Sequence, residues 1–198
     1  MPDRRAQVTR QTGETTITVS IALDGTGSCQ VSTGNGMLDH LLSQISRHSL
    51  IDITIQAQRD ASGWHHVAED IGIVLGRAFR EALGDGHGIR RMGHAIVPLD
   101  EALAMVAVDL SGRGYAQLDF AWASESVEDL PVEVVPHLLE AFAVEARMNL
   151  HVRVRSGKNN HHIAEAAMKA IARSLRDAVE PDPRGGPRAP STKGTISG

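Results

Sequence analysis

Six of the ten histidines in this chain belong to a pattern that occurs twice, 96 residues apart. In each copy two adjacent histidines precede a glutamate, which follows the second histidine by three residues. A lone histidine followed by two leucines lies 24 or 25 residues before each pair. The first copy contains His40, His65, His66 and Glu69, and the second contains His137, His161, His162 and Glu165. Imidazole and carboxylate groups together are typical ligands of first-row transition metals, so the pattern predicts a metal site.

The spacing within each copy indicates how many ions are bound. On a helix each residue turns by about 100°, so the glutamate can share a face with either histidine of its pair. The two adjacent histidines diverge by the same angle and therefore bind two separate ions more easily than one. A single double-histidine is more often a chance feature of a protein surface. Two copies with matched flanking residues favour a site with two metal ions.

The similarity between the two copies extends beyond these residues. Downstream of the pairs, Arg77 and Arg80 recur at the same interval as Arg173 and Arg176. Upstream, Glu14 and Glu101 each lie nine residues before a leucine that begins a glycine-containing turn. Self-similarity of this kind predicts a duplicated chain. We expect a single catalytic domain made of two repeats, about 1–93 and 94–183, with a C-terminal tail at 184–198.

Apolar periodicity predicts the same order of elements in each half. Alternating apolar and polar residues predict strands, and apolar residues three and four apart predict helices. In the first half the predicted strands are 15–23, 28–32 and 51–58, and the predicted helices are 37–48 and 67–83. In the second half the predicted strands are 103–110, 115–120 and 149–155, and the predicted helices are 134–147 and 162–179. Strand, strand, helix, strand, helix, repeated twice, indicates a layered α+β fold.

Composition limits the classes of partner and the compartment. The 198 residues are 41% hydrophobic and 22% charged, as in an ordinary globular domain. A formal net charge of -4 gives no indication of a nucleic-acid or membrane partner. The one cysteine, Cys29, excludes an internal disulfide framework and fits a reducing compartment. No apolar run has the length of a membrane span or of a signal core, so we expect a cytoplasmic protein.

Seven segments match the motifs of a known family in the same order. They are Gly-Asn-Gly-Met-Leu-Asp-His at 34–40, His-His-Val-Ala-Glu-Asp at 65–70, Gly-Ile-Arg-Arg-Met-Gly at 88–93, Asp-Glu-Ala-Leu at 100–103, Asp-Leu-Ser-Gly-Arg at 109–113, the second double-histidine segment at 160–167 and Pro-Ser-Thr-Lys-Gly at 190–194. On these motifs the chain resembles the imidazoleglycerol-phosphate dehydratase family over nearly its whole length. The resemblance implies an α+β fold of two duplicated half-domains. Each half is expected to be a mixed sheet of about four strands with two helices, and the helices are expected to pack between the sheets (ribosomal protein S5 domain 2-like).

The resemblance also implies a cofactor and an assembly. The family uses two manganese ions (Mn²⁺) per active site, and the ligands carry over by position. One ion takes His40, His66, His161 and Glu165, and the other takes His65, Glu69, His137 and His162. The family forms homo-oligomers, 24-mers built from trimers, with active sites between subunits. The ligand types by themselves leave the native metal open, because iron, cobalt or zinc also bind such groups.

The reaction that the resemblance implies is the dehydration of imidazole glycerol phosphate to imidazole acetol phosphate, a step of histidine biosynthesis. The proton that is lost lies beside the ring, on a carbon without a neighbouring carbonyl group. An imidazole bound to a cation can lose its ring proton, and the resulting imidazolate can expel the hydroxyl group. A proton shuttle is also needed, and the family places Glu14 in that role. Without the resemblance, Glu14 would be interpreted as a solvated residue at a strand start.

Further residues are implied to bind the substrate. The phosphate group needs cations with directed donors, and the resemblance assigns Arg91, Arg113, Ser191, Thr192 and Lys193 to this role. It places His48 at the edge of the substrate. The composition of 181–198, rich in proline and glycine, by itself predicts a disordered terminus. The resemblance instead implies that 191–193 closes over bound substrate.

One departure and two alternatives remain. The family usually has an aspartate before the first double-histidine, where this chain has Trp64; Asp60 could substitute if its loop folds back. Asn160 stands at the equivalent position of the second pair. A dinuclear hydrolase would also bind two ions through histidine and carboxylate, although it usually relies on a bridging aspartate. A metal buffer without catalytic activity is the other alternative, but it would not need arginines and a lysine around an anion.

Overall fold

The computed structural model describes residues 3–59 and 63–196, and it consists of two four-stranded sheets with four helices between them. The first sheet has the strand order β1 (Arg5–Gln11), β2 (Thr15–Ala22), β4 (Asp52–Arg59), β3 (Cys29–Ser32). The second has the order β5 (Met92–Leu99), β6 (Ala102–Asp109), β10 (Asn149–Ser156), β7 (Tyr115–Asp119). In each sheet the first three strands are antiparallel and the last pair is parallel. The two sheets are therefore copies of one topology.

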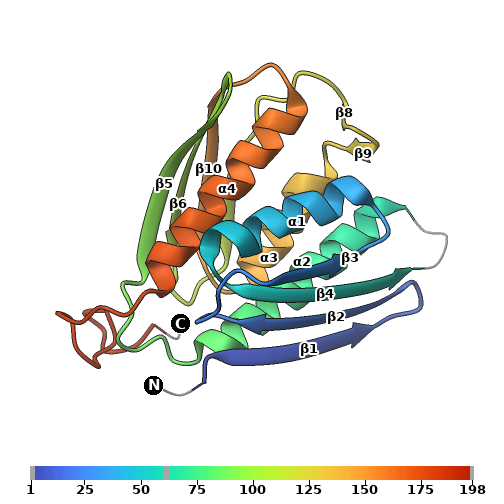
Figure 1. Ribbon diagram of the computed structural model, residues 1–198. Coiled ribbons are helices and arrows are strands. Elements are labelled where there is room, and N and C mark those ends of the chain that lie inside the picture. The colour runs from blue at the N-terminus through green and yellow to red at the C-terminus, as the bar shows by residue number, and fades with distance from the viewer. Residues whose placement is uncertain (1–2, 60–62, 197–198) are drawn as a thin grey trace.

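The helices fill the space between the sheets (Figure 1). The first half contributes α1 (Gly36–Ser49) and α2 (Trp64–Leu83), and the second contributes α3 (Val134–Glu145) and α4 (Asn160–Val179). Each helix of one half packs against a helix of the other, α1 against α4 and α2 against α3. Residues from the two halves consequently meet along two helix–helix contacts.

The core follows from the alternation in the strands and from two glycines in α2. Ile17, Val19 and Ile21 on β2 are buried, and the residues between them are only partly covered. A Cβ added to Gly72 would collide with the Leu138 carbonyl oxygen, and one added to Gly76 would lie 2.7 Å from the Phe142 carbonyl oxygen. The absence of side chains at both positions therefore lets α2 approach α3 closely.

The predicted α+β fold with helices between two sheets is confirmed, but the assignment from periodicity was incomplete. It found three strands in each half and omitted β1 and β5, which complete the sheets at one edge. Both are edge strands without a clear apolar alternation: β1 has only two apolar residues, Ala6 and Val8, and β5 carries apolar residues on both of its faces. It also omitted a small hairpin of β8 (Ser126–Val127) and β9 (Leu130–Pro131), which occurs in the second half before α3.

The helices are those of a globular core. Within residues 3–59 and 63–196, none is both long enough and apolar enough to cross a membrane.

Candidate active site

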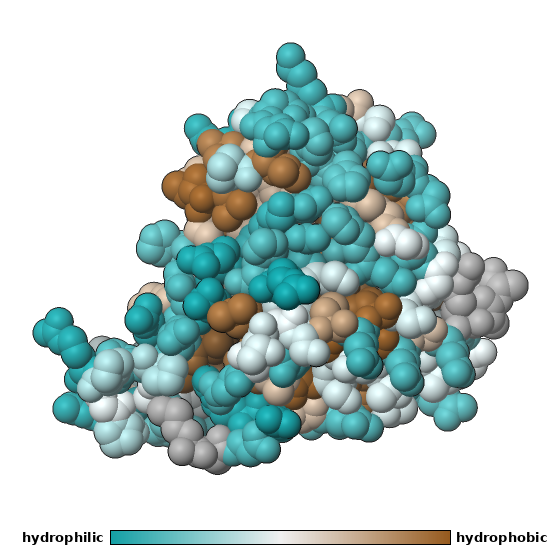
Figure 2. Space-filling view, in the orientation of Figure 1, coloured by the Kyte–Doolittle hydropathy of each residue, from teal (hydrophilic) through white to brown (hydrophobic). Residues whose placement is uncertain are grey.

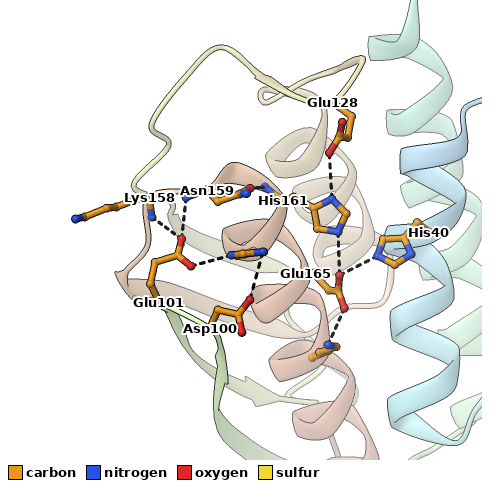
Figure 3. Close-up of polar contacts among 10 residues, drawn as sticks. His40, Asp100, Glu101, Glu128, Lys158, Asn159, His161 and Glu165 are labelled. Carbon is orange, nitrogen blue, oxygen red and sulfur yellow. Dashed lines mark hydrogen bonds and ion pairs between the residues drawn. The ribbon is translucent and has the colours of Figure 1, made fainter.

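A histidine from the first half meets a histidine and a glutamate from the second half across the contact between α1 and α4 (Figure 3). The Nε2 atom of His40 lies 2.9 Å from the Oε2 atom of Glu165, and the Nε2 atom of His161 lies 3.1 Å from the same oxygen. The side chain of Glu165 is 14% exposed. Of the residues that the structure describes, these three form the only histidine, cysteine or carboxylate group of three or more whose ligand atoms all lie within 4.8 Å.

The carboxyl group of Glu165 is ionised at neutral pH and can therefore bind a cation. Burial raises the pKa of this carboxyl, but hydrogen bonds from Lys169 and His40 outweigh burial and hold the pKa at about 2. The Nζ atom of Lys169 lies 2.6 Å from the Oε1 atom of Glu165. Two imidazole nitrogens and one ionised carboxylate therefore converge on one point, and this donor set fits a first-row divalent metal ion.

Both histidines of the second pair have a carboxylate beside the Nδ1 atom of the ring. The Nδ1 atom of His161 lies 3.3 Å from Glu128, which is carried by the turn between β8 and β9. The Nδ1 atom of His162 lies 2.7 Å from Glu101, in the turn between β5 and β6. The hydrogen bond with His162, with those from two backbone N–H groups, lowers the pKa of Glu101 to about 2, and the same bond raises the pKa of His162.

The first repeat is arranged differently. The rings of His65 and His137 lie with centroids 4.2 Å apart, so α2 and α3 bring these two predicted ligands together. The Nδ1 atom of His66 lies 2.9 Å from Glu14, in the turn between β1 and β2. Glu69 is exposed, and no residue that the structure describes forms an ion pair or hydrogen bond with its carboxylate. The chain thus assembles three of the four ligands predicted for one ion and two of the four predicted for the other.

A second polar region lies beyond the C-terminal end of α4. A hollow of about 690 Å³, here called the tail hollow, is lined by all five residues to which the resemblance assigned phosphate binding: Arg91, Arg113, Ser191, Thr192 and Lys193. The guanidinium of Arg91 donates to Asp109 at 2.6 and 2.9 Å and to the carbonyl oxygen of Pro190 at 2.8 Å. This last bond holds the C-terminal segment against the second half.

The described part of the tail does not match the disorder that its composition predicts. Pro181 pairs with Ile89 in an isolated β-bridge, and the Gly88 N–H donates to the Arg188 carbonyl oxygen at 3.0 Å. Ile196 is buried. Contacts with the loop between α2 and β5 therefore order a segment that has too few apolar residues to form a core of its own.

The remaining predicted residues lie near one or other region. His48, in the last turn of α1, interacts with Gln44 at 3.2 Å; its pKa is lowered by burial and then by the charge of Lys169. Trp64 begins α2, is half-buried and packs against the core, so it replaces the usual aspartate with an apolar contact. Asp60 lies outside the described residues. Asn160 is buried and accepts the Ala123 N–H at 2.8 Å, which anchors the segment before β8.

Sequence reasoning missed four polar residues near these regions. Lys169 follows Glu165 by one helical turn, and this i, i+4 spacing could have indicated the pair. Ser111 belongs to the Asp-Leu-Ser-Gly-Arg motif and lines the tail hollow, and its buried hydroxyl has no hydrogen-bond partner among residues 3–59 and 63–196. In the sequence Glu101 is distinguished only as the repeat of Glu14, and this gives no indication of its contact with His162. No sequence signal pointed to Glu128, because its hairpin has no counterpart in the part of the first half that the structure describes.

The two polar regions lie at opposite ends of α4. Glu165 is in its first turns, whereas the Arg91 N–H donates to the carbonyl oxygen of Ala178 near its C-terminal end. At 1.5 Å per residue, the backbone positions of Glu165 and Ala178 are separated by about 20 Å. In Figure 1 the tail lies at one end of α4, and β8 and β9 lie toward the other. A molecule that contacted both regions of one chain would have to span a distance of this order.

Comparisons with known proteins identify one family throughout. A family model described as imidazoleglycerol-phosphate dehydratase matches residues 33–175. An imidazoleglycerol-phosphate dehydratase from Dehalococcoides mccartyi is 50% identical over 196 residues, 99% of each chain. One from Granulibacter bethesdensis is 51% identical over 194 residues, 98% of this chain and 99% of the relative. The crystal structure of the Staphylococcus aureus enzyme superposes with a TM-score of 0.82 at 35% identity, covering 90% of this chain and 99% of that one. The Pyrococcus furiosus enzyme gives a TM-score of 0.82 at 36% identity, covering 94% and 99%.

Proposed function

The chain belongs to the imidazoleglycerol-phosphate dehydratase family, and from that premise we propose that it removes water from imidazole glycerol phosphate at a site that holds two Mn²⁺ ions. The enzyme is a hydro-lyase of histidine biosynthesis, and its product is imidazole acetol phosphate. The observation that carries the metal-dependent mechanism is the meeting of His40 from one half with His161 and Glu165 from the other. This meeting creates a ligand set that neither repeat contains alone.

The proposed ligand sets follow the family positions. His40, His161 and Glu165, together with His66, would hold one ion, and His65, His137, Glu69 and His162 would hold the other. Ions held by these residues would supply Lewis-acid chemistry at the substrate ring, which favours loss of the hydroxyl group. Each set combines three imidazoles with one carboxylate, and these donors suit a first-row divalent ion.

Residues outside the ligand sets are proposed to transfer the proton and to bind the phosphate. Glu14 is proposed to shuttle the proton; it is exposed at a turn, and its carboxylate already lies 2.9 Å from His66. Arg91, Arg113, Ser191, Thr192 and Lys193 are proposed to bind the phosphate in the tail hollow, which all five line. His48 would lie at the substrate edge. Cationic and hydroxyl donors in one hollow suit a phosphate dianion.

The separation of about 20 Å along α4 supports a complete site that is built from more than one subunit. We propose that neighbouring copies bring the tail hollow of one chain to the histidines of another and supply the missing ligands, in the 24-mer of trimers that the family forms. In this arrangement the two repeats of each chain, about 1–93 and 94–183, act as one domain, with the tail at 184–198 completing a site.

The outer faces of the two sheets support an assembly. On the first sheet the outer residues of β2 and its neighbours are polar, such as Thr18, Gln7 and Gln56. On the second sheet Met92, Ile96, Met105 and Tyr115 are exposed. A shallow hollow of about 510 Å³ runs over this second face, and apolar side chains gather along the β5 edge of the molecule (Figure 2). The face combines these apolar side chains with polar ones such as His94 and Arg153, and a patch of exposed apolar side chains is typical of a subunit interface.

The function is tested by incubating protein loaded with Mn²⁺ with imidazole glycerol phosphate and following the appearance of the ketone product. The expected result is turnover that is lost after chelation and restored by Mn²⁺. Hydrolysis of a phosphoester without formation of the ketone would favour a dinuclear hydrolase. Metal uptake without any turnover would favour a metal buffer. Elemental analysis of protein purified without added metal identifies the native ion.

A further inference from the structure

Glu101 connects the turn between β5 and β6 to the start of α4 through both of its carboxylate oxygens (Figure 3). One oxygen, Oε2, lies 2.7 Å from the Nδ1 atom of His162. The other, Oε1, accepts the backbone N–H groups of Lys158 and Asn159 at 3.0 and 2.9 Å. The carboxylate is therefore held by the loop that leads into the helix, and its free side faces a single histidine ring.

This contact determines which ring nitrogen of His162 is available. An imidazole whose Nδ1–H donates to a carboxylate has its lone pair on Nε2, the atom that then binds a metal ion. The Nε2 atom of His162 faces Asp100 at 3.6 Å, and the Asp100 side chain is 72% exposed. This end of the ring therefore points toward the accessible surface and not into the core.

Building on the proposed function, we propose that Glu101 is a positioning residue that fixes the ring orientation and tautomer of His162 and so prepares its Nε2 atom for one of the two metal ions. The fixed carboxylate removes the rotation of the ring that a metal ion would otherwise have to arrest. It also increases the basicity of the ligand nitrogen. Glu101 touches neither substrate nor metal in this role.

The duplicate of Glu101 in the first half is Glu14, and the two residues differ in how firmly the carboxylate is held. Both carboxylates contact the Nδ1 atom of the second histidine of a pair, at 2.9 Å for His66 and 2.7 Å for His162. The second oxygen of Glu101 is occupied by two backbone N–H groups. A carboxylate held on both oxygens is a good support and a poor proton shuttle, because it cannot reorient during a reaction cycle.

The test compares Glu101→Gln with Glu101→Ala and with a matched control, Glu81→Gln. Glutamine keeps an oxygen for the Lys158 and Asn159 N–H groups but presents an amide to His162, which no longer favours a proton on Nδ1. Glu81 is exposed near the end of α2, so its substitution removes one charge far from the histidines. Binding of Mn²⁺ to the full chain is measured from the electron paramagnetic resonance signal of the free ion.

Wild-type protein and Glu81→Gln are expected to bind two Mn²⁺ ions per chain with equal affinity. Glu101→Gln is expected to bind one ion as tightly as wild type and the other about 10- to 100-fold more weakly. If Glu101→Gln binds both ions like wild type and only Glu101→Ala is weakened, Glu101 is a clamp for the loop, and the proposal is wrong while the proposed function stands. Wild-type protein that binds no Mn²⁺ would overturn both.

Discussion

In the second repeat His161 and Glu165 lie 3.1 Å apart and meet His40 across the contact between α1 and α4, whereas in the first repeat Glu69 is exposed and His66 interacts with Glu14. The sequence pattern is the same in both repeats. The difference comes from neighbours: Lys169 lies one turn after Glu165 and binds its second oxygen, but the equivalent position after Glu69 is Ile73.

A second asymmetry is the hairpin of β8 and β9. It contacts His161 through Glu128, and through Asp129 it binds the side chain of Asn35 at 3.0 Å. Asn35 caps α1, the helix that carries His40, by accepting the Leu38 N–H. The hairpin therefore braces both sides of the assembled group. One histidine group is therefore assembled within its own chain, whereas the other is only partly assembled there.

Removal of metal should have the largest effect, because the incomplete group has few contacts within its own chain. We expect chelation to dissociate the proposed 24-mer into smaller species and to abolish dehydratase activity, and Mn²⁺ to restore both. Size-exclusion chromatography with and without chelator measures the particle. A particle that keeps its size without metal would show that the first histidine group does not hold subunits together.

Glu165 and Glu69 occupy equivalent positions in the two repeats, so the same substitution can be made in each. We expect Glu165→Gln and Glu69→Gln each to lower kcat/KM by about 10²–10³-fold or more, as for loss of a charged group at a reacting centre. In the metal-free protein only Glu165→Gln should lower the melting temperature, by a few degrees, because a lost charged hydrogen bond costs about 1.5–3 kcal/mol. Equal melting temperatures for the two metal-free variants would contradict the assembled state of the second group.

A substitution in the tail hollow should weaken substrate binding and leave metal binding unchanged. Arg113→Ala removes a cation from the proposed phosphate site, so we expect KM to rise about 10- to 100-fold, which corresponds to the loss of one charged hydrogen bond. Because the hollow lies at the other end of α4, the content of Mn²⁺ should not change. Kinetic constants and elemental analysis of the same preparation measure both properties, and loss of metal in Arg113→Ala would argue against separate regions.

The smallest expected effect is on stability, and it arises at the contact between α2 and α3. There Arg77 on α2 donates to Glu145 on α3 at 3.0 and 3.1 Å. These hydrogen bonds lower the pKa of Glu145. A lowered pKa in the folded state stabilises the protein at pH values above the ordinary pKa of 4.5, and this stability is lost as the pH falls through the folded value. The pair is partly exposed, so its contribution should be about 0.5–1 kcal/mol.

Chemical denaturation of the metal-free protein between pH 7 and pH 3 measures this contribution. We expect the free energy of unfolding of Glu145→Gln to be lower than that of wild type at pH 7 and to converge with it at acid pH. Glu81→Gln serves as the control. A gap between Glu145→Gln and wild type that stays constant down to pH 3 would exclude a role for the charge of Glu145.

The duplicated order of elements and the residue types of the site could be predicted from the chain alone. The 96-residue interval marks α2 and α4, and the histidines lie in their first turns as expected. The strands β1 and β5 could not be assigned in this way, because β1 has few apolar residues and β5 has apolar residues on both faces, so neither alternates clearly. Composition alone predicts a disordered tail, but the described part of the tail is ordered by contacts with Arg91 and the 84–91 loop.

The amino-acid sequence by itself determined which side chains are available to bind metal and phosphate, and in which repeat each one lies, since these depend on residue type and helical spacing. Residue spacing does not bring His40 to His161 and Glu165, a meeting that only the family resemblance implied. The tertiary structure places these side chains together, and it places the tail hollow near the C-terminal end of α4. The reason is physical: the packing of α1 on α4 and the rigid length of a helix are set by contacts between residues far apart in the chain.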